Sequence, residues 1–489
     1  MLDPFHYHVI KDPIHQIMQW EHDVYKKIVK PIMDSPVFQR MRYIYQLGMT
    51  DKVFPGSTHT RFSHSLGCCY VASRIFKKLF ASLLASDPFA YGLMEKYVLA
   101  TSLLHDIGHG PFSHAFERFF HNKFRKRGET WMDFKIDHED WTREFLKNDM
   151  RAVVDSIFEA EGDSIENICA LISHKSVEFG SLGKWMSLAG DIISSQLDAD
   201  RMDYLLRDGH FCGVAYGTFD LEWMINAIHY EEMKGKYRMS ITRKGVGAIE
   251  HFLAARRLMT QNIYHHLKVK AEEEIMVELL LKLHHEIFAR YLDGDLYGFL
   301  KVVDDIDKSC EDREQTRNRI LKEAYPFFKK ISDHDIYHAV KNIIAHPLSD
   351  GIFQEVLELA EVIYYREKWP SAWKLDANRR GIEGVVERTR QELGLSFEKN
   401  WQLKVIEYPF KMLKTDRDPI LVSDDYQTQL GSNIQGLSEF AKQMGGRQEK
   451  IVFLSIHHTL MEKDAVKKLH DRLLEEQFFA LPPPPSMLG

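Results

Sequence analysis

The sequence predicts a mainly α protein, in which an all-helical core is followed by a C-terminal α+β lobe. Apolar residues recur at helical spacing over most of the first 300 residues, as they do in residues 98–104. The composition changes after about residue 300, where residues 304–318 are rich in charge and typical of a solvated surface segment. Two strand-like runs then follow, over residues 401–407 and 450–455.

The individual helices follow from this spacing and from the residues that interrupt it. The helix over residues 98–104 should end at residues 108–111, because two glycines and a proline break the pattern there. Asp137 is a suitable N-cap for a later helix. The pattern predicts further helices over residues 113–121, 138–147, 192–208, 245–288, 335–344, 352–364 and 383–393, with a short strand over residues 237–242.

A chain of 489 residues is long enough for two or three domains, or for one large core with appended lobes. We expect a core over residues 1–300, an α+β lobe over residues 301–480, and a Pro-rich tail over residues 481–489. The tail cannot be helical, because four prolines follow one another in it.

Bulk composition excludes several classes of protein. Hydrophobic residues make up 44% of the chain and charged residues 28%, the balance of an ordinary globular protein. The net charge of -7 argues against a surface that holds long nucleic acid. Five cysteines without a CxxC pair argue against disulfides or a cysteine zinc site. No run is apolar enough for a membrane span or a signal peptide, so we expect a cytoplasmic protein.

His105 and Asp106 are the first candidates for chemistry. Neighbouring residues on a helix point about 100° apart, so both can reach one metal ion only from a helix end, where this pair is expected to lie. Imidazole and carboxylate ligands together suit Fe, Mn, Zn, Ni or Co. Taken alone the dipeptide is a weak signal, because a helix-end histidine beside a solvated aspartate arises often by chance.

Three longer strings surround this pair. They are Phe54-Pro55-Gly56-Ser57-Thr58-His59-Thr60-Arg61-Phe62-Ser63-His64-Ser65-Leu66-Gly67, His105-Asp106-Ile107-Gly108-His109-Gly110-Pro111-Phe112-Ser113-His114 and Asp198-Ala199-Asp200-Arg201-Met202-Asp203-Tyr204-Leu205-Leu206-Arg207-Asp208. Through them the sequence resembles the HD-domain superfamily over about residues 8–290. More narrowly, it is similar to the deoxynucleoside triphosphate triphosphohydrolases, which include bacterial dGTPases and a vertebrate enzyme with a sterile alpha motif. We expect no sterile alpha motif here, because the matching strings begin almost at Met1.

The resemblance implies a metal site made of His64, His105, Asp106 and Asp200. Two imidazoles and two carboxylates satisfy a first-row divalent ion and leave positions for water and a phosphate oxygen. The candidate ions are Mn, Fe, Zn, Ni and Co, and Mg is a further candidate beside the substrate phosphates. Asp198 competes with Asp200 as the fourth ligand, but the string that Asp200 opens is in register with the family.

The resemblance also implies the substrate contacts. Arg61, Arg201 and Arg256 would face the phosphates, since the planar guanidinium can hold two oxygens. Tyr204 would pack beside the sugar, and Asp208 would accept a hydrogen bond from its 3′-hydroxyl. The remaining implied contacts, to the base, the ribose or the phosphates, are Gln46, Leu47, His114, Tyr264 and His266. Surface ion pairs for the arginines and a buried core pair for Tyr264 and His266 are the structural alternatives.

For acid–base chemistry the resemblance implies His138, Glu117 and His109. A carboxylate bonded to an imidazole raises its basicity and fixes its orientation, so Glu117 would support His138. His109 would hold phosphate.

Asp34, Gln39 and Arg42 match a string that binds an activating nucleotide between subunits in the vertebrate relative. His8 and Lys11 differ from that enzyme, so the string is equally compatible with a fold element that has no regulatory role.

The function implied is hydrolysis of a dNTP to deoxynucleoside and inorganic triphosphate, for control of dNTP pools or defence against phage. The expected partners are dNTPs, a nucleotide activator and further copies of the chain in a dimer or tetramer. Two alternatives stay open. One is a phosphodiesterase or nuclease that acts on other nucleotides or on single-stranded DNA. The other is a regulator that binds nucleotide without turnover.

Overall fold

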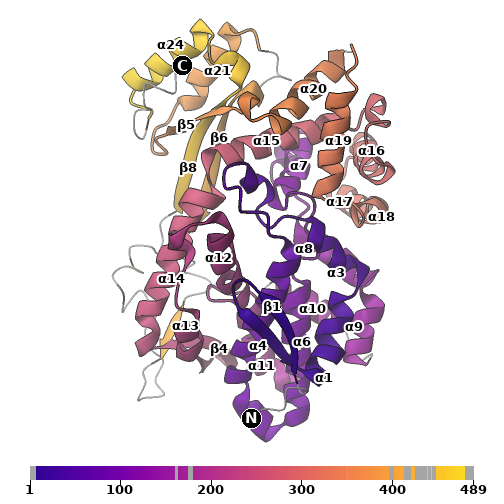
Figure 1. Ribbon diagram of the computed structural model, residues 1–489, viewed down its shortest axis with the longest axis vertical. Coiled ribbons are helices and arrows are strands. Elements are labelled where there is room, and N and C mark those ends of the chain that lie inside the picture. The colour runs from indigo at the N-terminus through magenta and orange to yellow at the C-terminus, as the bar shows by residue number, and fades with distance from the viewer. Residues whose placement is uncertain are drawn as a thin grey trace.

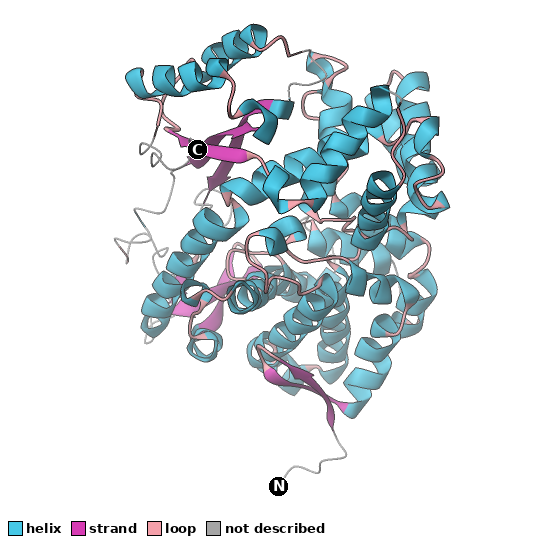
Figure 2. Ribbon diagram, turned by 45° about the horizontal axis from the view of Figure 1, so that its top comes forward, coloured by secondary structure: helices cyan, strands magenta, loops and turns pink. Residues whose placement is uncertain are grey.

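The computed structural model describes residues 7–159, 164–173, 180–349, 351–395, 401–411, 420–423, 438, 442 and 448–479 (Figure 1). Helices dominate it, which confirms the prediction of a mainly α protein (Figure 2). The predicted tail over residues 481–489 lies outside the described residues. No helix in the described ranges combines the length and the apolar character that a bilayer span requires.

The longer helices of the first 300 residues form one packed group around the candidate site. They are α4 (Arg61–Leu79), α6 (Pro88–Leu104), α7 (His114–Arg125), α8 (His138–Lys147), α9 (Arg151–Phe158), α10 (Ser164–Ile172), α11 (Gly183–Ile193), α12 (Ala199–Cys212), α14 (Val246–Met259), α15 (Leu267–Lys282) and α16 (Gly294–Ser309). The shorter ones are α1 (His22–Val24), α2 (Lys30–Met33), α3 (Pro36–Arg40), α5 (Ala81–Ser86) and α13 (Leu221–Ala227).

The remaining helices follow in the last third of the chain. They are α17 (Arg313–Glu323), α18 (Tyr325–Phe328), α19 (Asp333–Ala345), α20 (Gly351–Tyr364), α21 (Ile382–Glu392) and α24 (Asp464–Glu475).

The described strands make three small sheets. β1 (Tyr7–Asp12) pairs antiparallel with β2 (Gln16–Glu21). β3 (Ile228–Met233) pairs antiparallel with β4 (Lys236–Thr242), which pairs parallel with β7 (Leu421–Ser423). In the third sheet, β8 (Gln448–Ile456) lies between β5 (Ser371–Leu375) and β6 (Leu403–Lys411), antiparallel to both. The predicted strands over residues 237–242, 401–407 and 450–455 are therefore confirmed.

Two of the three hydrophobic clusters among the described residues hold most of the buried apolar side chains, and the third joins Ala271 of α15 to the third sheet. The large cluster runs from Met18 to Val422 and includes the buried side chains of α16 to α20. The small one joins the third sheet to α21 and α24, which lie together at one end of the molecule (Figure 1). The division predicted at residue 300 stays a prediction, and helices on both sides of it share the large cluster.

The structure corrects several predictions of local structure. The core is not entirely helical, because β1 and β2 form a hairpin whose turn is fixed by Asp12, the acceptor for the backbone N–H groups of Ile14 and His15. The predicted helix over residues 192–208 is two helices. α11 ends at Ile193, and Asp198 caps α12 by accepting from the backbone N–H of Arg201.

One further prediction of a continuous helix was wrong. The predicted helix over residues 245–288 is interrupted after α14, where residues 260–264 form a π-helical turn and His265 leaves the helical conformation. The prediction of a surface segment over residues 304–318 agrees with the exposure of most of their side chains, and this stretch holds the end of α16 and the start of α17. Asp304 is buried and pairs with Lys123 at 3.1 Å and Lys308 at 2.6 Å, which compensates its charge.

A buried polar strut connects α19 with the loop after α6. The Asp333 carboxylate accepts from the backbone N–H of Tyr45 at 2.9 Å and of Phe112 at 2.7 Å. Phe112 and Ser113 both have positive φ, of 54° and 57°, which is unfavourable for residues with a side chain. Asp333 therefore holds a strained loop in place from a position more than 200 residues later in the sequence.

Replacing Asp333 with alanine should destabilise the protein by about 2–4 kcal/mol, because two buried N–H groups lose their acceptor. Urea unfolding measures the change. The matched control is Lys341→Ala, which alters an exposed side chain on the same helix and should leave the unfolding midpoint in place. An unchanged midpoint for Asp333→Ala would contradict the role assigned to the strut.

Candidate active site

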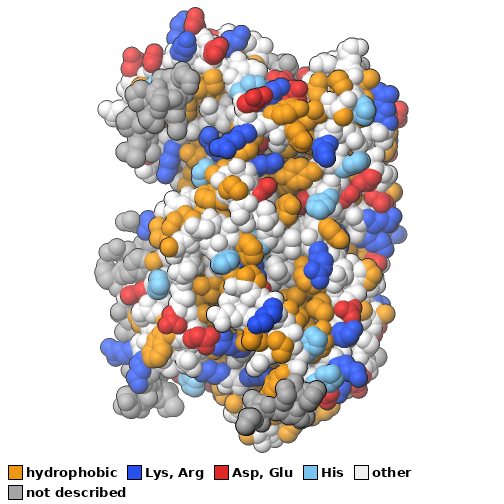
Figure 3. All heavy atoms as spheres, viewed as in Figure 1, with side chains coloured by type: hydrophobic (Ala, Val, Ile, Leu, Met, Phe, Trp, Pro, Cys, Tyr) orange, Lys and Arg blue, Asp and Glu red, His pale blue; other side chains and the backbone are white. Residues whose placement is uncertain are grey.

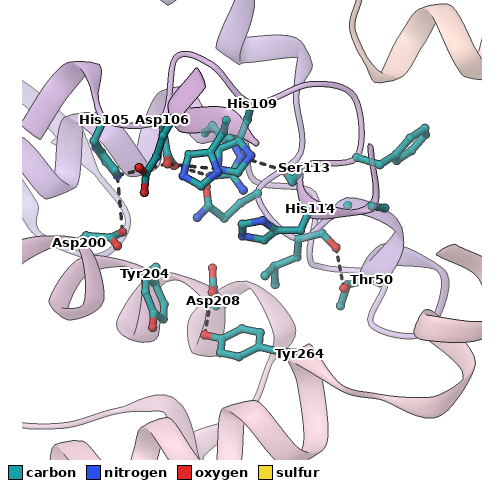
Figure 4. Close-up of a pocket in the computed structure, with 18 of the residues that line it drawn as sticks. Thr50, His105, Asp106, His109, Ser113, His114, Asp200, Tyr204, Asp208 and Tyr264 are labelled. Carbon is teal, nitrogen blue, oxygen red and sulfur yellow. Dashed lines mark hydrogen bonds and ion pairs between the residues drawn. The ribbon is translucent and has the colours of Figure 1, made fainter. Parts of the chain in front are cut away.

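A cavity of about 430 Å³ lies between the end of α6, the start of α7, and helices α12 and α15 (Figure 4). This volume is within the range that small-molecule sites occupy. The predicted site residues in its wall are Gln46, Leu47, Arg61, His105, Asp106, His109, His114, His138, Asp200, Tyr204, Asp208 and Tyr264. Residues from six separate stretches of the chain thus meet around one space.

At one end of the cavity, four side chains converge on a common point. His64 Nε2 is 3.0 Å from Asp200 Oδ1 and 3.7 Å from Asp106 Oδ2. His105 Nε2 is 3.6 Å from Asp200 Oδ1 and 3.5 Å from Asp106 Oδ1. The ligand atoms of His64, His105 and Asp200 lie within 4.8 Å of one another, which is close enough for one ion.

The hydrogen bonds of the two histidines fit a metal at this point. His64 Nδ1 is 2.8 Å from Asp203 Oδ2, and His105 Nδ1 is 2.9 Å from the carbonyl oxygen of Ser102. Both Nε2 atoms are buried and lack a partner with hydrogen-bond geometry among the described residues. A proton on each Nδ1 leaves the Nε2 lone pair directed at the cluster, as metal-binding histidines require.

Asp203 is a functional candidate that the sequence analysis missed. It is fully buried, and besides His64 it binds His15 Nε2 at 2.7 Å and the Nε and Nη2 atoms of Arg207 at 2.8 and 2.9 Å. Gly67 on α4 permits this approach, because a Cβ there would lie 1.9 Å from Asp203 Oδ1. The available signal was its position three residues after Asp200, which places both carboxylates on neighbouring sides of α12.

Arg61 lies beside this cluster. Its guanidinium pairs with Asp106 and donates through Nε to Ser113 Oγ at 2.8 Å. Arg61 and Asp106 are both buried, and their ion pair fixes the position of the guanidinium at the cavity wall.

Next to the cluster, His138 and Glu117 form a hydrogen-bonded pair. Glu117 Oε1 is 2.7 Å from His138 Nδ1 and also accepts from the backbone N–H of His138 at 3.3 Å. Gly108 allows the start of α8 to come this close, since a Cβ there would lie 2.1 Å from the carbonyl oxygen of His138. Asp137 and Asp140 form a capping box that fixes the same helix start, so the predicted N-cap is confirmed.

The charges around this pair favour a protonated His138. Burial lowers the pKa of His138, but the hydrogen bond to Glu117 and its charge outweigh burial, and the pKa is raised. Burial raises the pKa of Glu117, but His114 and His138 hold it well below its usual range. His109 stacks on His138 at 4.0 Å, and burial, Arg61 and His138 keep the pKa of His109 well below its usual value. These four side chains form a second group able to hold a metal ion.

At the other side of the cavity, Asp208 is held by two partners. His59 Nε2 is 2.7 Å from Asp208 Oδ1, and Tyr264 Oη donates to Asp208 Oδ2 at 2.9 Å. The rings of Tyr204 and Tyr264 meet edge to face at 6.0 Å (Figure 4). His59 was missed by the sequence analysis, although it lies two residues before Arg61 in the string that carries the resemblance.

Three predicted substrate residues do not line the cavity. Arg201 pairs with Asp198 and donates to the carbonyl oxygen of Ser195. His266 packs edge to face on Phe54 at 5.5 Å. Arg256 lies on α14 near Tyr204. Because Asp198 caps α12, it is not directed at the metal cluster, and the choice of Asp200 over Asp198 agrees with this geometry.

The residues predicted for an activator bind one another outside the cavity. Arg42 donates to Gln39 Oε1 at 2.8 Å and lies 3.5 Å above the Phe62 ring, while Asp34 pairs with Lys30. A nucleotide site at Asp34, Gln39 and Arg42 stays a prediction.

Comparisons with known proteins agree with these features. The profile of the HD domain family matches residues 61–208. An uncharacterised Mycoplasma pneumoniae protein is 30% identical over 73% of this chain and 79% of its own length. A zebrafish protein named deoxynucleoside triphosphate triphosphohydrolase SAMHD1 is 26% identical over 65% of this chain and 52% of its own.

A solved structure, described as a phosphohydrolase from Bacteroides thetaiotaomicron, matches with a TM-score of 0.71. The match covers 92% of this chain and 100% of that one at 24% identity, and it shows a shared fold. Other curated relatives are matched over about half of their length or a little more, 55% for a Bacillus subtilis protein and 60% for one from Methanocaldococcus jannaschii.

Proposed function

Because this chain belongs to the HD-domain family that includes deoxynucleoside triphosphate triphosphohydrolases, we propose that it hydrolyses dNTPs to deoxynucleoside and inorganic triphosphate. One observation carries the proposal. A single cavity holds the cluster of His105, Asp106 and Asp200 at one end and the Asp208–Tyr264 pair farther along its wall. The first group suits phosphate chemistry, and the second suits a deoxyribose.

His64, His105, Asp106 and Asp200 would hold a divalent metal ion, with Mn, Fe, Zn, Ni and Co as the candidates. When bound, such an ion supplies Lewis-acid polarisation of phosphate and a lowered pKa for water. The protein's own contribution around it is charge and position. Arg61 neutralises the growing charge on the phosphate chain, and Asp203 fixes the ring of His64.

The bond that breaks joins the α-phosphorus to the 5′-oxygen, with water as the attacking group. The 5′-oxygen leaves as an alkoxide unless it receives a proton, and His138 would donate that proton from Nε2 because Nδ1 is bonded to Glu117. His109 and His114 flank His138, at 4.0 and 5.7 Å between ring centroids, and would contact phosphate.

The sugar would lie on Tyr204 and Tyr264, with its 3′-hydroxyl near Asp208. Gln46 and Leu47 would contact the base and ribose. Arg201, Arg256 and His266 would act only if substrate binding moves them toward the cavity, since none of them lines it.

The test is a triphosphate-release assay on the metal-loaded protein. The substrates are the four dNTPs, the four NTPs, single-stranded DNA and nucleoside monophosphates. We expect triphosphate from dNTPs, little from NTPs because a tyrosine under the sugar would leave little space for a 2′-hydroxyl, and no cleavage of DNA. Cleavage of DNA or monophosphates alone would make the protein a nuclease or phosphodiesterase. Nucleotide binding without turnover under every candidate metal would make it a regulator.

The charge distribution favours a small nucleotide over DNA. Acidic and basic side chains are interspersed on the face shown in Figure 3, and no broad basic area occurs among the described residues drawn there. Together with the net charge of -7, this disfavours a polyanion that must contact many phosphates at once.

Replacing Asp208 with alanine should lower kcat/KM for a dNTP by about 10- to 100-fold, the value of a hydrogen bond to a charged group. The 2′,3′-dideoxy substrate should be poor with the wild-type protein and no poorer with the variant, since its 3′-hydroxyl is absent already. Steady-state kinetics on the two proteins and two substrates measures this coupling. Equal losses on both substrates would exclude a contact between Asp208 and the 3′-hydroxyl.

The wider proposal concerns the role of the reaction and its control. Hydrolysis of dNTPs would limit dNTP pools, or deplete them against phage, and the protein would work as a dimer or tetramer in the cytoplasm. Activation by a nucleotide at Asp34, Gln39 and Arg42 is tested by measuring triphosphate release from one dNTP with and without added GTP or a second dNTP.

A further inference from the structure

Two charged residues on α15 line the cavity without a role in the chemistry described above. They are Lys270 and Glu273. Lys270 Nζ is 2.9 Å from Glu273 Oε1 and 2.8 Å from Glu273 Oε2. Their side chains are only 15% and 8% exposed, so the pair is desolvated rather than a surface ion pair. Because Lys270 and Glu273 line the cavity, a ligand that enters it can contact these two charged side chains.

The pair is held from behind by a polar network that reaches the third sheet. Arg118 Nη2 donates to Glu273 Oε2 at 2.7 Å, and Arg118 also binds Glu274 and the hydroxyl of Tyr408 on β6. The ring of Tyr408 lies 5.3 Å from Lys270 Nζ. The C-terminal lobe therefore fixes one wall of the cavity.

This network decides which of the two charges remains available to a ligand. The carboxylate of Glu273 already accepts hydrogen bonds on both oxygens, from Lys270 and from Arg118. The ammonium of Lys270 carries three protons and uses two of them on Glu273. The third proton of Lys270 is thus the hydrogen-bond donor that this wall can offer to a ligand.

The position of Lys270 along the cavity indicates which part of a bound nucleotide it would contact. α15 begins three residues after Tyr264, whose hydroxyl binds Asp208, and it packs against residues 48–52. Thr50 marks the end of the cavity away from His105 and Asp200 (Figure 4). A nucleotide with its phosphates at His105 and its sugar at Asp208 places its base at that end.

We propose that Lys270 selects the base of the nucleotide and favours guanine, an inference that rests on the proposed function. Guanine presents two adjacent acceptors, O6 and N7, to a lysine, whereas adenine and cytosine present an amino group at the corresponding position. An amino group facing a desolvated ammonium leaves both without an acceptor. Thymine, with its O4 acceptor, ranks between guanine and the amino bases.

The first test uses base analogues with the unchanged protein. In competition assays of triphosphate release, kcat/KM should follow the order dGTP, dTTP, then dATP and dCTP. Deoxyinosine triphosphate keeps O6 and N7 and should behave as dGTP does. The 7-deaza analogue of dGTP lacks N7 and should be poorer. Equal kcat/KM for dGTP and dATP would overturn the inference while leaving the proposed function intact.

The second test uses Lys270→Met, which keeps the length of the side chain and removes its charge. It should lower kcat/KM for dGTP by about 10- to 100-fold, the value of one such base contact, and leave that for dATP nearly unchanged. Lys268→Met alters an exposed lysine on the same helix and should change neither. A uniform loss on all four dNTPs would show a structural role for Lys270 and refute base selection.

Equilibrium binding separates the two proposals. Calorimetric titration of the metal-free protein with dGTP and with dATP needs no turnover. Tighter binding of dGTP that is lost in Lys270→Met supports base selection even if no triphosphate is released. Equal binding of both nucleotides, or binding of neither, overturns it.

Discussion

His105→Ala is expected to abolish triphosphate release, with kcat lowered on the order of 10³-fold or more, because the metal cluster loses one of its two imidazoles. His105 Nε2 lies 3.5 Å from Asp106 Oδ1 and 3.6 Å from Asp200 Oδ1, so it is central to the four side chains. Metal content, measured by atomic absorption on the purified protein, should fall in parallel.

The variant should keep its fold and part of its nucleotide affinity. Among the described residues, the His105 side chain makes one hydrogen bond, from Nδ1 to the carbonyl oxygen of Ser102. Its removal costs about 0.5–1.5 kcal/mol, which a protein of this size tolerates. Arg61, Tyr204 and Asp208 remain to bind phosphate and sugar.

His210→Ala is the matched control, since His210 is exposed and lies outside the cavity wall. It should keep full metal content and activity. If His105→Ala kept its metal and its activity, the ion would have to be bound elsewhere. The group formed by His109, His114, Glu117 and His138 would then be the alternative.

The residues of the candidate metal site could be proposed from the sequence because each lies in a short string that is recognisable on its own. Asp106 and Asp200 are recognised by the residues that follow them, and the fold needs only to bring those strings together. The same holds for Asp137, whose capping box is complete within four residues.

The supporting residues were not predictable, because their roles exist only between elements that are distant in sequence. His59 and Asp208 are 149 residues apart, and Phe112 and Asp333 are 221 apart. A histidine or aspartate alone gives no sign of such a partner. The same reason applies to Lys270, whose importance depends on Arg118 and on β6.

Helix ends were missed where a polar residue overrides an apolar pattern. The sequence pattern of residues 192–208 favours one continuous helix, but Asp198 accepts backbone hydrogen bonds from Ser195 and Arg201 and so starts a new one. This break matters for the site, because it sets the direction of α12 and thereby the positions of Asp200 and Asp208.

His138→Ala is expected to lower kcat by about 10²- to 10⁴-fold, the usual contribution of a general acid, with a smaller effect on KM. The loss should nearly disappear with an aryl triphosphate, whose phenolate leaves without a proton. Glu117→Gln in the His138→Ala background should add little, since Glu117 acts through His138. A full loss on the aryl substrate would refute proton donation by His138.

The pH profile tests the same pair independently. Under the proposed mechanism the acid form of His138 is the active one, so kcat should fall as the pH rises through the pKa of this group. Glu117 raises that pKa against the effect of burial. Glu117→Gln removes the negative charge and leaves burial unopposed, so the falling limb should move to lower pH. A limb that stayed in place, or moved to higher pH, would show that Glu117 does not set the proton affinity of His138. The pair would then serve only to join α7 to α8.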